Sequence, residues 1–213
     1  MNHQASIVVT ICLISTLIFA GESTEACDGD QINENPEPEY SESAGIVPAS
    51  VDEVWELFTT AKGLSSFYAR EAIIDPKVGG LFELHVFPEN PPGRRGIEGH
   101  QVLAIEPKHR LVLSWIAPAA IRSKIGPQTT IQEITLVPIG LNETRVRLRQ
   151  FGFGESNGWS GAKEYFELRS HDVVLNIKER VENGTLDWER AMNRFYETTR
   201  RIDELGVLQS KHQ

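Results

Sequence analysis

The long amphipathic stretch at residues 158–184 constrains the fold more than any other part of the chain. It reads GWSGAKEYFELRSHDVVLNIKERVENG, and its apolar residues recur at the spacing of a helix with one buried stripe. At the centre of the stripe, where an apolar residue is due, the chain has Ser170 with His171 beside it. The other members of the stripe are Trp159, Ala162, Phe166, Val173, Ile177 and Val181.

A helix of this length requires a large apolar partner surface. Isolated helices are only marginally stable in water, so packing must supply most of the stability. Burial of the stripe at about 1.5–3 kcal/mol per large side chain contributes on the order of 10 kcal/mol, which is comparable to the net stability of a whole domain. We therefore expect this helix to lie in the central core.

An antiparallel sheet is the partner surface that the sequence offers. Alternating runs at residues 96–107 and 110–117 are joined by a short link, and the runs at residues 129–139 and 144–153 flank GLNE. Short links between consecutive strands predict hairpins. We expect a sheet that curves around the long helix and leaves a cavity between the two.

One short strand and two short helices precede this series of strands. Ser50 and Glu53 form a capping-box pattern at the start of the first helix, and the second helix is expected to end by Tyr68. Because the strands and the helices are segregated along the chain, the predicted class is α+β.

Residues 1–26 have the features of an export signal. An uncharged, mostly apolar run is followed by small and polar residues, and it is short for a membrane span. This predicts export to the periplasm or the extracellular space, with cleavage after Ala20 or Ala26. Two alternatives stay open, namely a lipoprotein modified at Cys27 and an uncleaved membrane anchor.

The rest of the chain divides into three parts. Residues 27–43 are acidic, polar and contain proline, which predicts a flexible linker. The folded domain is expected at residues 44–184, with a helical C-terminal extension at residues 185–213. The extension has an apolar stripe that is expected to pack on the surface of the domain, or alternatively to join two copies in a homodimer. This stripe consists of Trp188, Met192, Phe195, Thr199, Ile202 and Leu205.

Charge and residue spacing argue against several functional classes. The net charge is −9, from 21 basic and 30 acidic residues that are interspersed, so nucleic acid is not expected as a partner. The six histidines show no metal-ligand spacing, and we expect no metal and no cofactor. The sequence has no Gly-x-Ser-x-Gly elbow, and His171 lies at the flank of the long helix. No catalytic constellation is visible, and whether any catalysis occurs stays open.

Four segments in a fixed order carry a resemblance to a known family. They are VPASVDEVWELFT, DPKVGGLFEL, GHQVLAIEPKHRLVLSW and GWSGAKEYF. The chain resembles the SRPBCC (START/Bet v 1-like) superfamily and, within it, the family named for the C-terminal domain of the activator of Hsp90 ATPase. The resemblance implies a helix-grip fold. Members of that family often have an aromatic residue in the middle of the long helix, where this chain has Ser170.

The resemblance implies that a small apolar or amphipathic ligand binds between the long helix and the sheet. A small residue at position 170 would enlarge the cavity, and Ser170 or His171 would orient a polar group of the ligand. The alternative is a chaperone-linked protein-interaction module, which export would separate from its intracellular, ATP-dependent partner. The predicted ligand-binding residues are Phe82, Trp115, Trp159, Phe166, Ser170, Val173 and Ile177.

Overall fold

The computed structural model describes residues 39–117, 121–122, 125–126, 128–155 and 158–204. The predicted signal, Cys27, most of the predicted linker and the end of the predicted extension lie outside these residues. None of the helices in the described ranges is both long enough and apolar enough to cross a membrane.

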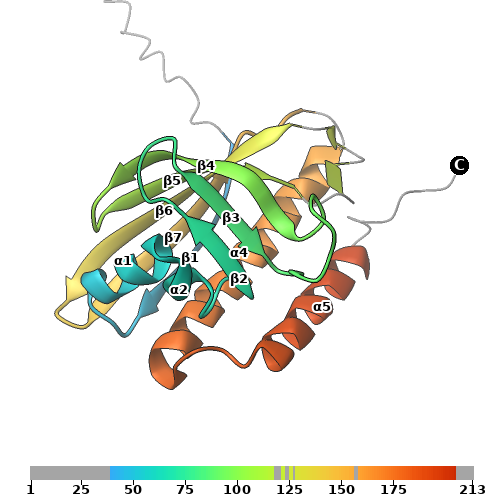
Figure 1. Ribbon diagram of the computed structural model, residues 1–213. Helices are drawn as coiled ribbons and strands as arrows, with labels where there is room; N and C mark the ends of the chain where they lie inside the picture. The colour runs from blue at the N-terminus through green and yellow to red at the C-terminus, as the bar shows by residue number, and fades with distance from the viewer. Residues whose placement is uncertain (1–38, 118–120, 123–124, 127, 156–157, 205–213) are drawn as a thin grey trace, which may run out of the picture. The chain divides into compact units, whose positions relative to one another are not determined.

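The described residues have the α+β architecture that the sequence predicts (Figure 1). A strand and two short helices come first, then six strands, then two longer helices. In chain order the elements are β1 (Tyr40–Val47), α1 (Val51–Thr59), α2 (Ala61–Leu64), β2 (Glu71–Ile74), β3 (Leu81–His85), β4 (Gly96–Glu106), β5 (Arg110–Ile116), β6 (Thr129–Gly140), β7 (Glu143–Phe151), α4 (Gly158–Asn183) and α5 (Trp188–Glu204).

The strands form one antiparallel sheet in the order β1-β7-β6-β5-β4-β3-β2. The β4–β5 and β6–β7 hairpins confirm the two strand pairs predicted from their short links. The register shifts within the β3–β4, β4–β5 and β6–β7 pairs. Because such irregularities bend strands and increase their twist, they help the sheet to curve around α4 (Figure 1).

β1 begins at Tyr40, before the predicted start of the folded domain at Ala44. It pairs with β7 from Tyr40, opposite Phe151, and Ser41 and Ser43 are buried. Residues 40–43, which the sequence pattern assigned to the linker, therefore form the start of β1. The sequence pattern missed this part of the strand because small polar residues occupy its inner face, where an apolar residue would signal burial.

α1 begins at the predicted capping box. The Ser50 hydroxyl accepts a hydrogen bond from the Glu53 backbone N–H (3.4 Å), and Glu53 Oε2 accepts one from the Ser50 backbone N–H (2.9 Å). These bonds satisfy amides that the first turn of a helix leaves unpaired. Further along, Phe58 of α1 and Phe67 pack edge to face with ring centroids 5.3 Å apart, so α1 and the segment after α2 contribute to the core.

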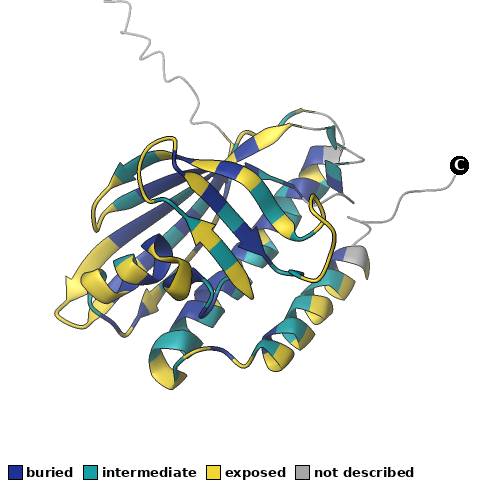
Figure 2. Ribbon diagram, viewed as in Figure 1, coloured by how far each residue is buried: buried dark blue, intermediate teal, exposed yellow. Residues whose placement is uncertain are grey.

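α4 packs against the inner face of the sheet. Buried and exposed residues alternate along the strands in Figure 2, as expected when one face of a sheet is covered. The helix lies close to the sheet at Gly45 of β1, where an added Cβ would lie 2.5 Å from Val174 Cγ1. The predicted stripe of α4 is buried at Trp159, Ala162, Phe166, Ser170, Val173 and Ile177.

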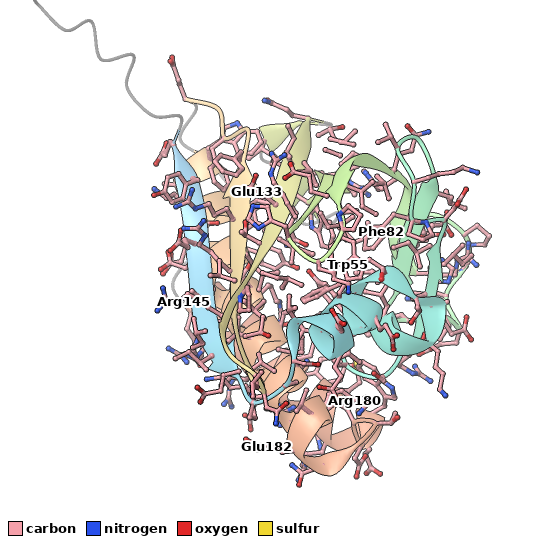
Figure 3. The ribbon with its side chains drawn as sticks, turned by 90° about the vertical axis from the view of Figure 1, so that its left-hand side faces the viewer. Trp55, Phe82, Glu133, Arg145, Arg180 and Glu182 are labelled. Atoms are coloured by element: carbon pink, nitrogen blue, oxygen red, sulfur yellow. The ribbon has the colours of Figure 1, made fainter. Side chains whose placement is uncertain are left out.

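The C-terminal half of α4 is bonded to the segment after α2. Asn176 Nδ2 donates to the Phe67 carbonyl (3.2 Å), and Arg180 Nε donates to Ser66 Oγ (2.8 Å). Arg180 is labelled in Figure 3 towards the end of the helix. The chain then leaves α4 at Gly184, whose φ of 88° suits glycine, and continues into α5.

Candidate functional site

A cavity of about 190 Å³ lies between the sheet, α4 and α5. For comparison, an engineered cavity of about 150 Å³ in another protein binds benzene. The volume therefore suits a small organic molecule. Most of the side chains that line it are apolar or aromatic.

The sheet wall of the cavity is apolar apart from one glutamine. Leu84 of β3, Ile97 of β4 and Trp115 of β5 lie on this wall together with Gln132 of β6. Tyr68, which follows α2, continues the wall, and its ring centroid lies 6.1 Å from that of Trp115. The wall thus combines residues from distant parts of the sequence.

A hydrogen bond joins the two polar groups of the sheet wall. The Tyr68 hydroxyl donates to Gln132 Oε1 at 2.8 Å. Burial raises the pKa of Tyr68 well above its ordinary value, although the hydrogen bond to Gln132 acts in the opposite direction. Tyr68 is therefore a neutral donor. The Gln132 carbonyl oxygen accepts this hydrogen bond, and the donor group of the same side chain is its Nε2.

The α4 wall contains the serine that the sequence singled out. Ser170 is only 4% exposed and lines the cavity with Tyr165, Val173 and Asn176. A large side chain at position 170 would extend into this space. The small side chain of Ser170 is therefore one cause of the cavity. Leaving such volume unfilled in a core generally lowers the stability of the fold.

Three of the seven predicted ligand-binding residues line the cavity, namely Trp115, Ser170 and Val173. The others are buried in the core beside it. Phe82 packs against Trp115 at 5.9 Å between ring centroids. The N-terminal part of the α4 stripe packs against Phe153 instead. The residues that do not line the cavity are Phe82, Trp159, Phe166 and Ile177.

α5 supplies a wall that the sequence analysis did not assign to the site. Trp188, Ala191, Met192 and Phe195 line the cavity. The Trp188 indole also donates from Nε1 to the Ser65 carbonyl (3.2 Å), which positions the start of α5. The aromatic stripe of the extension was a signal for this role, but periodicity alone does not say what a stripe packs against.

Arg169 of α4 holds α5 against the cavity. Its guanidinium carbon lies 3.8 Å from the centre of the Phe195 ring, and Nη1 donates to the Phe195 carbonyl (3.0 Å) and to Asp172 (3.3 Å). Nη2 donates to the Thr199 hydroxyl. The buried Nε has no hydrogen-bond partner within the described part of the chain. The junction of α4 and α5 is thus both aromatic and charged.

The other two charged residues of the lining are also paired. Asp172 accepts a hydrogen bond from the Thr198 hydroxyl (3.2 Å) in addition to the one from the arginine. Arg194 pairs with Glu179 (2.7 Å) and donates to Asn176 Oδ1 (2.8 Å). Positive and negative groups beside the cavity therefore offset one another.

The connection between β3 and β4 completes the aromatic lining. Phe87 lies 5.6 Å from Phe195 and 6.5 Å from Tyr196 between ring centroids. This connection is itself fixed by Glu98 of β4, which accepts from the Arg95 backbone N–H (2.9 Å) and pairs with the Arg95 guanidinium (2.7 Å). A binding site for a small molecule needs such a combination of apolar walls and a few oriented polar groups.

None of the histidines in the described ranges lines this cavity. His85 and His100 are on neighbouring strands but are not register partners, and the described residues contain no cluster of metal-ligand type. Burial lowers the pKa of His100, whose Nδ1 lies 3.2 Å from Ser114 Oγ. His171 is exposed on α4 and is not among the lining residues.

Several solved structures share the fold at low sequence identity. CalU16 from Micromonospora echinospora is 18% identical, with a TM-score of 0.52 over 82% of this chain and 98% of that one. The Aha1 dimer from Colwellia psychrerythraea is 16% identical, with a TM-score of 0.51 over 70% of this chain and 99% of that one. A protein from Nitrosospira multiformis is 14% identical, with a TM-score of 0.53 over 71% and 99%. No curated protein sequence matches the chain.

A family match agrees with these folds and with the four sequence segments. The family described as Activator of Hsp90 ATPase homolog 1-like protein matches residues 48–172. The matched range begins just before α1 and ends within α4, so α5 and its wall of the cavity lie beyond it. Because this match covers more than half of the sequence, the chain belongs to the family of Activator of Hsp90 ATPase homolog 1-like proteins.

Proposed function

We propose that the chain binds a small apolar or amphipathic ligand in the cavity between the sheet, α4 and α5. The observation that carries this proposal is the aromatic-lined cavity of about 190 Å³ with Ser170 in its α4 wall. The apolar walls favour binding because they remove ligand surface from water. Ser170 and Gln132 supply polar groups that orient the ligand.

Native mass spectrometry tests this proposal directly. Protein purified from its own compartment should have an added small-molecule mass. An apolar fluorescent probe should also bind, and Ser170→Trp should abolish its binding because the indole fills the cavity, whereas Ser170→Ala should retain it. Ligand-free spectra combined with probe binding that Ser170→Trp leaves unchanged would contradict the proposal.

Family membership favours a second candidate, a protein-interaction module that stimulates an Hsp90-type ATPase. The likeness to the Aha1 structure from Colwellia psychrerythraea supports the fold that such a module requires. The test is the rate of ATP hydrolysis by Hsp90 of the same organism with and without the full chain. An unchanged rate over a wide concentration range would exclude this candidate.

We also propose that the chain is exported, on the strength of the apolar, uncharged segment within residues 1–26. Export would keep the protein away from an intracellular ATPase, so it favours ligand binding over the second candidate. The intact mass of the mature protein tests this. A mass that begins at Met1 would contradict cleavage, and a lipid-sized increment on Cys27 would identify the lipoprotein alternative.

A homodimer through the extension would use the outward face of α5, where Tyr196 is 55% exposed. The solved relative from Colwellia psychrerythraea is described as a dimer. Light scattering of the full chain measures the mass in solution. A dimer that uses this face should dissociate on Tyr196→Glu, because the substitution places a charge in the contact.

A further inference from the structure

We infer that the cavity selects a neutral aromatic compound of one or two rings that carries one hydrogen-bond acceptor. This inference rests on the proposed ligand-binding function and adds the chemical class of the ligand. It follows from which polar groups of the lining already have hydrogen-bond or ion-pair partners and from which groups supply hydrogen-bond donors to a ligand.

The preference for an aromatic ring follows from the walls. Tyr68 and Trp115 lie on the sheet side, Tyr165 lies on α4, and Trp188 and Phe195 lie on α5. Aromatic pairs gain more than their buried area alone provides, because the ring edges and faces are electrostatically complementary. A flat ring between these walls is therefore favoured over a saturated ring, which is also thicker.

The preference for an uncharged ligand follows from the ion pairs of the lining. An anion would gain little net attraction from Arg169 or Arg194, because Asp172 and Glu179 already neutralise these two guanidiniums. A cation would meet the guanidinium of Arg169, which already covers the face of Phe195. Because the charge of a ligand of either sign would lose its hydration beside guanidinium and carboxylate groups that already neutralise one another, a charged ligand is disfavoured.

The preference for an acceptor follows from Gln132 and Ser170. Gln132 lines the cavity and its carbonyl oxygen accepts from Tyr68, so we assign its Nε2 as the donor of this wall. Ser170 contributes a hydroxyl from the α4 wall, and both residues line the cavity. An entirely apolar ligand would cut such a donor off from water and leave it unpaired, which is unfavourable. A ligand that carries an acceptor would form a hydrogen bond with the donor instead.

A matched set of small compounds tests all three features. Acetophenone has the inferred properties, ethylbenzene lacks the acceptor, cyclohexyl methyl ketone lacks the aromatic ring, and benzoate and benzylammonium carry charges of opposite sign. Titrations of the full chain followed by protein NMR give the five dissociation constants. Acetophenone should bind most tightly, by about fivefold over ethylbenzene and by more over the two ions.

A double variant tests the role of the sheet wall. Tyr68→Phe combined with Gln132→Leu removes both polar partners at once, so neither is left buried and unsatisfied. The preference for acetophenone over ethylbenzene should shrink to about twofold or less in this variant, with the remainder due to Ser170. Ser170→Ala serves as the matched change on the opposite wall and should cause a smaller loss of preference.

The outcomes separate this inference from the proposal on which it rests. Tighter binding of benzoate, benzylammonium, ethylbenzene or cyclohexyl methyl ketone than of acetophenone would overturn the inference, as would a preference that the folded double variant keeps in full. If the double variant does not fold, the ranking on the wild-type chain decides. Binding of the apolar probe alone, with none of the five compounds, would overturn the inference but leave the proposed function standing, whereas failure of both would remove both.

Discussion

At position 170, α4 carries a serine on the buried stripe that faces the sheet. The side chain is 4% exposed and lines the cavity, so the position is buried without being filled. A helix that places a small polar residue here gives up burial of apolar surface. The chain therefore has less apolar packing at position 170 and more cavity volume beside it.

Filling the cavity should therefore have opposite effects on the stability of the fold and on ligand binding. We expect Ser170→Leu to raise the free energy of unfolding by about 1 kcal/mol, because added apolar volume in a cavity is stabilising. The same variant should weaken binding of an apolar probe. Thermal denaturation and probe titration measure the two effects, with Ser170→Ala as the control that adds no volume. A loss of both stability and binding would mean that the site cannot accept a larger residue.

The carboxyl group of Glu98, near the aromatic lining, contributes to the dependence of folding stability on acid pH. Burial alone would raise the pKa of its carboxyl, but the backbone amides of Gly93 and Arg95 and the Arg95 guanidinium outweigh this and lower the pKa to about 2. The ordinary value is 4.5. Because the folded-state pKa is the lower one, the stabilisation is present above pH 4.5 and is lost as the pH falls from 4.5 towards 2.

We therefore expect Glu98→Gln to flatten the acid limb of the stability curve. The wild-type melting temperature should fall between pH 5 and pH 3 by more than that of the variant, because only the wild-type carboxyl takes up a proton on unfolding. Melting curves across this range provide the measurement. Arg95→Gln keeps the backbone amide donors and should give an intermediate slope; equal slopes for all three chains would contradict the assignment.

At the scale of the elements, α4 presents different faces to different partners. Phe166 packs against Phe153 just after β7, Val174 packs against β1 at Gly45, and Arg169 is hydrogen-bonded to α5. The helix is therefore covered over much more of its circumference than one apolar stripe indicates. Polar residues on the α5 side are compatible with this because they are hydrogen-bonded across the junction.

The contact between α4 and β1 leaves no room for a side chain at Gly45. A Cβ there would lie 2.5 Å from Val174 Cγ1, and valine has little rotamer freedom in a helix. We expect Gly45→Ala to destabilise the chain by about 1–3 kcal/mol through overpacking. Chemical denaturation measures this. Gly140→Ala is the matched control, because its Cβ would have a nearest contact of 3.5 Å; equal effects would argue against the close approach.

α5 depends on Arg169 for its attachment. Hydrogen bonds to a charged group contribute about 1.5–3 kcal/mol each, so Arg169→Met should increase hydrogen exchange in α5 by about tenfold or more and leave the strands unchanged. Mass spectrometry of exchanged peptides resolves the two regions. Arg200→Met, at a side chain that is 72% exposed, is the control. Faster exchange throughout the sheet would indicate a general loss of stability instead of release of α5.

At the scale of the whole molecule, the outer face of the sheet carries ion pairs, whereas the hydrophobic core lies against the inner face. Arg149 pairs with Glu42 (2.6 Å) and Arg110 with Glu133 (2.5 Å) on this face. Glu133 and Arg145 are labelled on it in Figure 3. Along β7, Arg145 and Arg149 alternate with the buried Val146 and Leu148, since neighbouring side chains of a strand point to opposite faces.

Local sequence signals predicted most of the elements and part of the site. The capping box at Ser50 and the two hairpins were readable because their signals lie within a few residues of one another. The start of β1 was missed because Ser41 and Ser43 mask its inner face. Ser170 and Trp115 were readable as cavity residues, whereas Gln132 and Tyr68 were not, because their pairing joins positions 64 residues apart.

The sequence by itself determined the class of the fold, the hairpins, the amphipathic long helix and the gap in its stripe at Ser170, because these depend on periodicity and short-range spacing. Only the tertiary structure decided that the cavity between the sheet and α4 extends to α5, that the extension forms one of its walls, and that Phe82, Trp159, Phe166 and Ile177 fill the core instead. The physical reason is that a stripe specifies burial but not its partner. The partner depends on how the sheet curves and on which contacts, such as those of Arg169, hold the last helix in place.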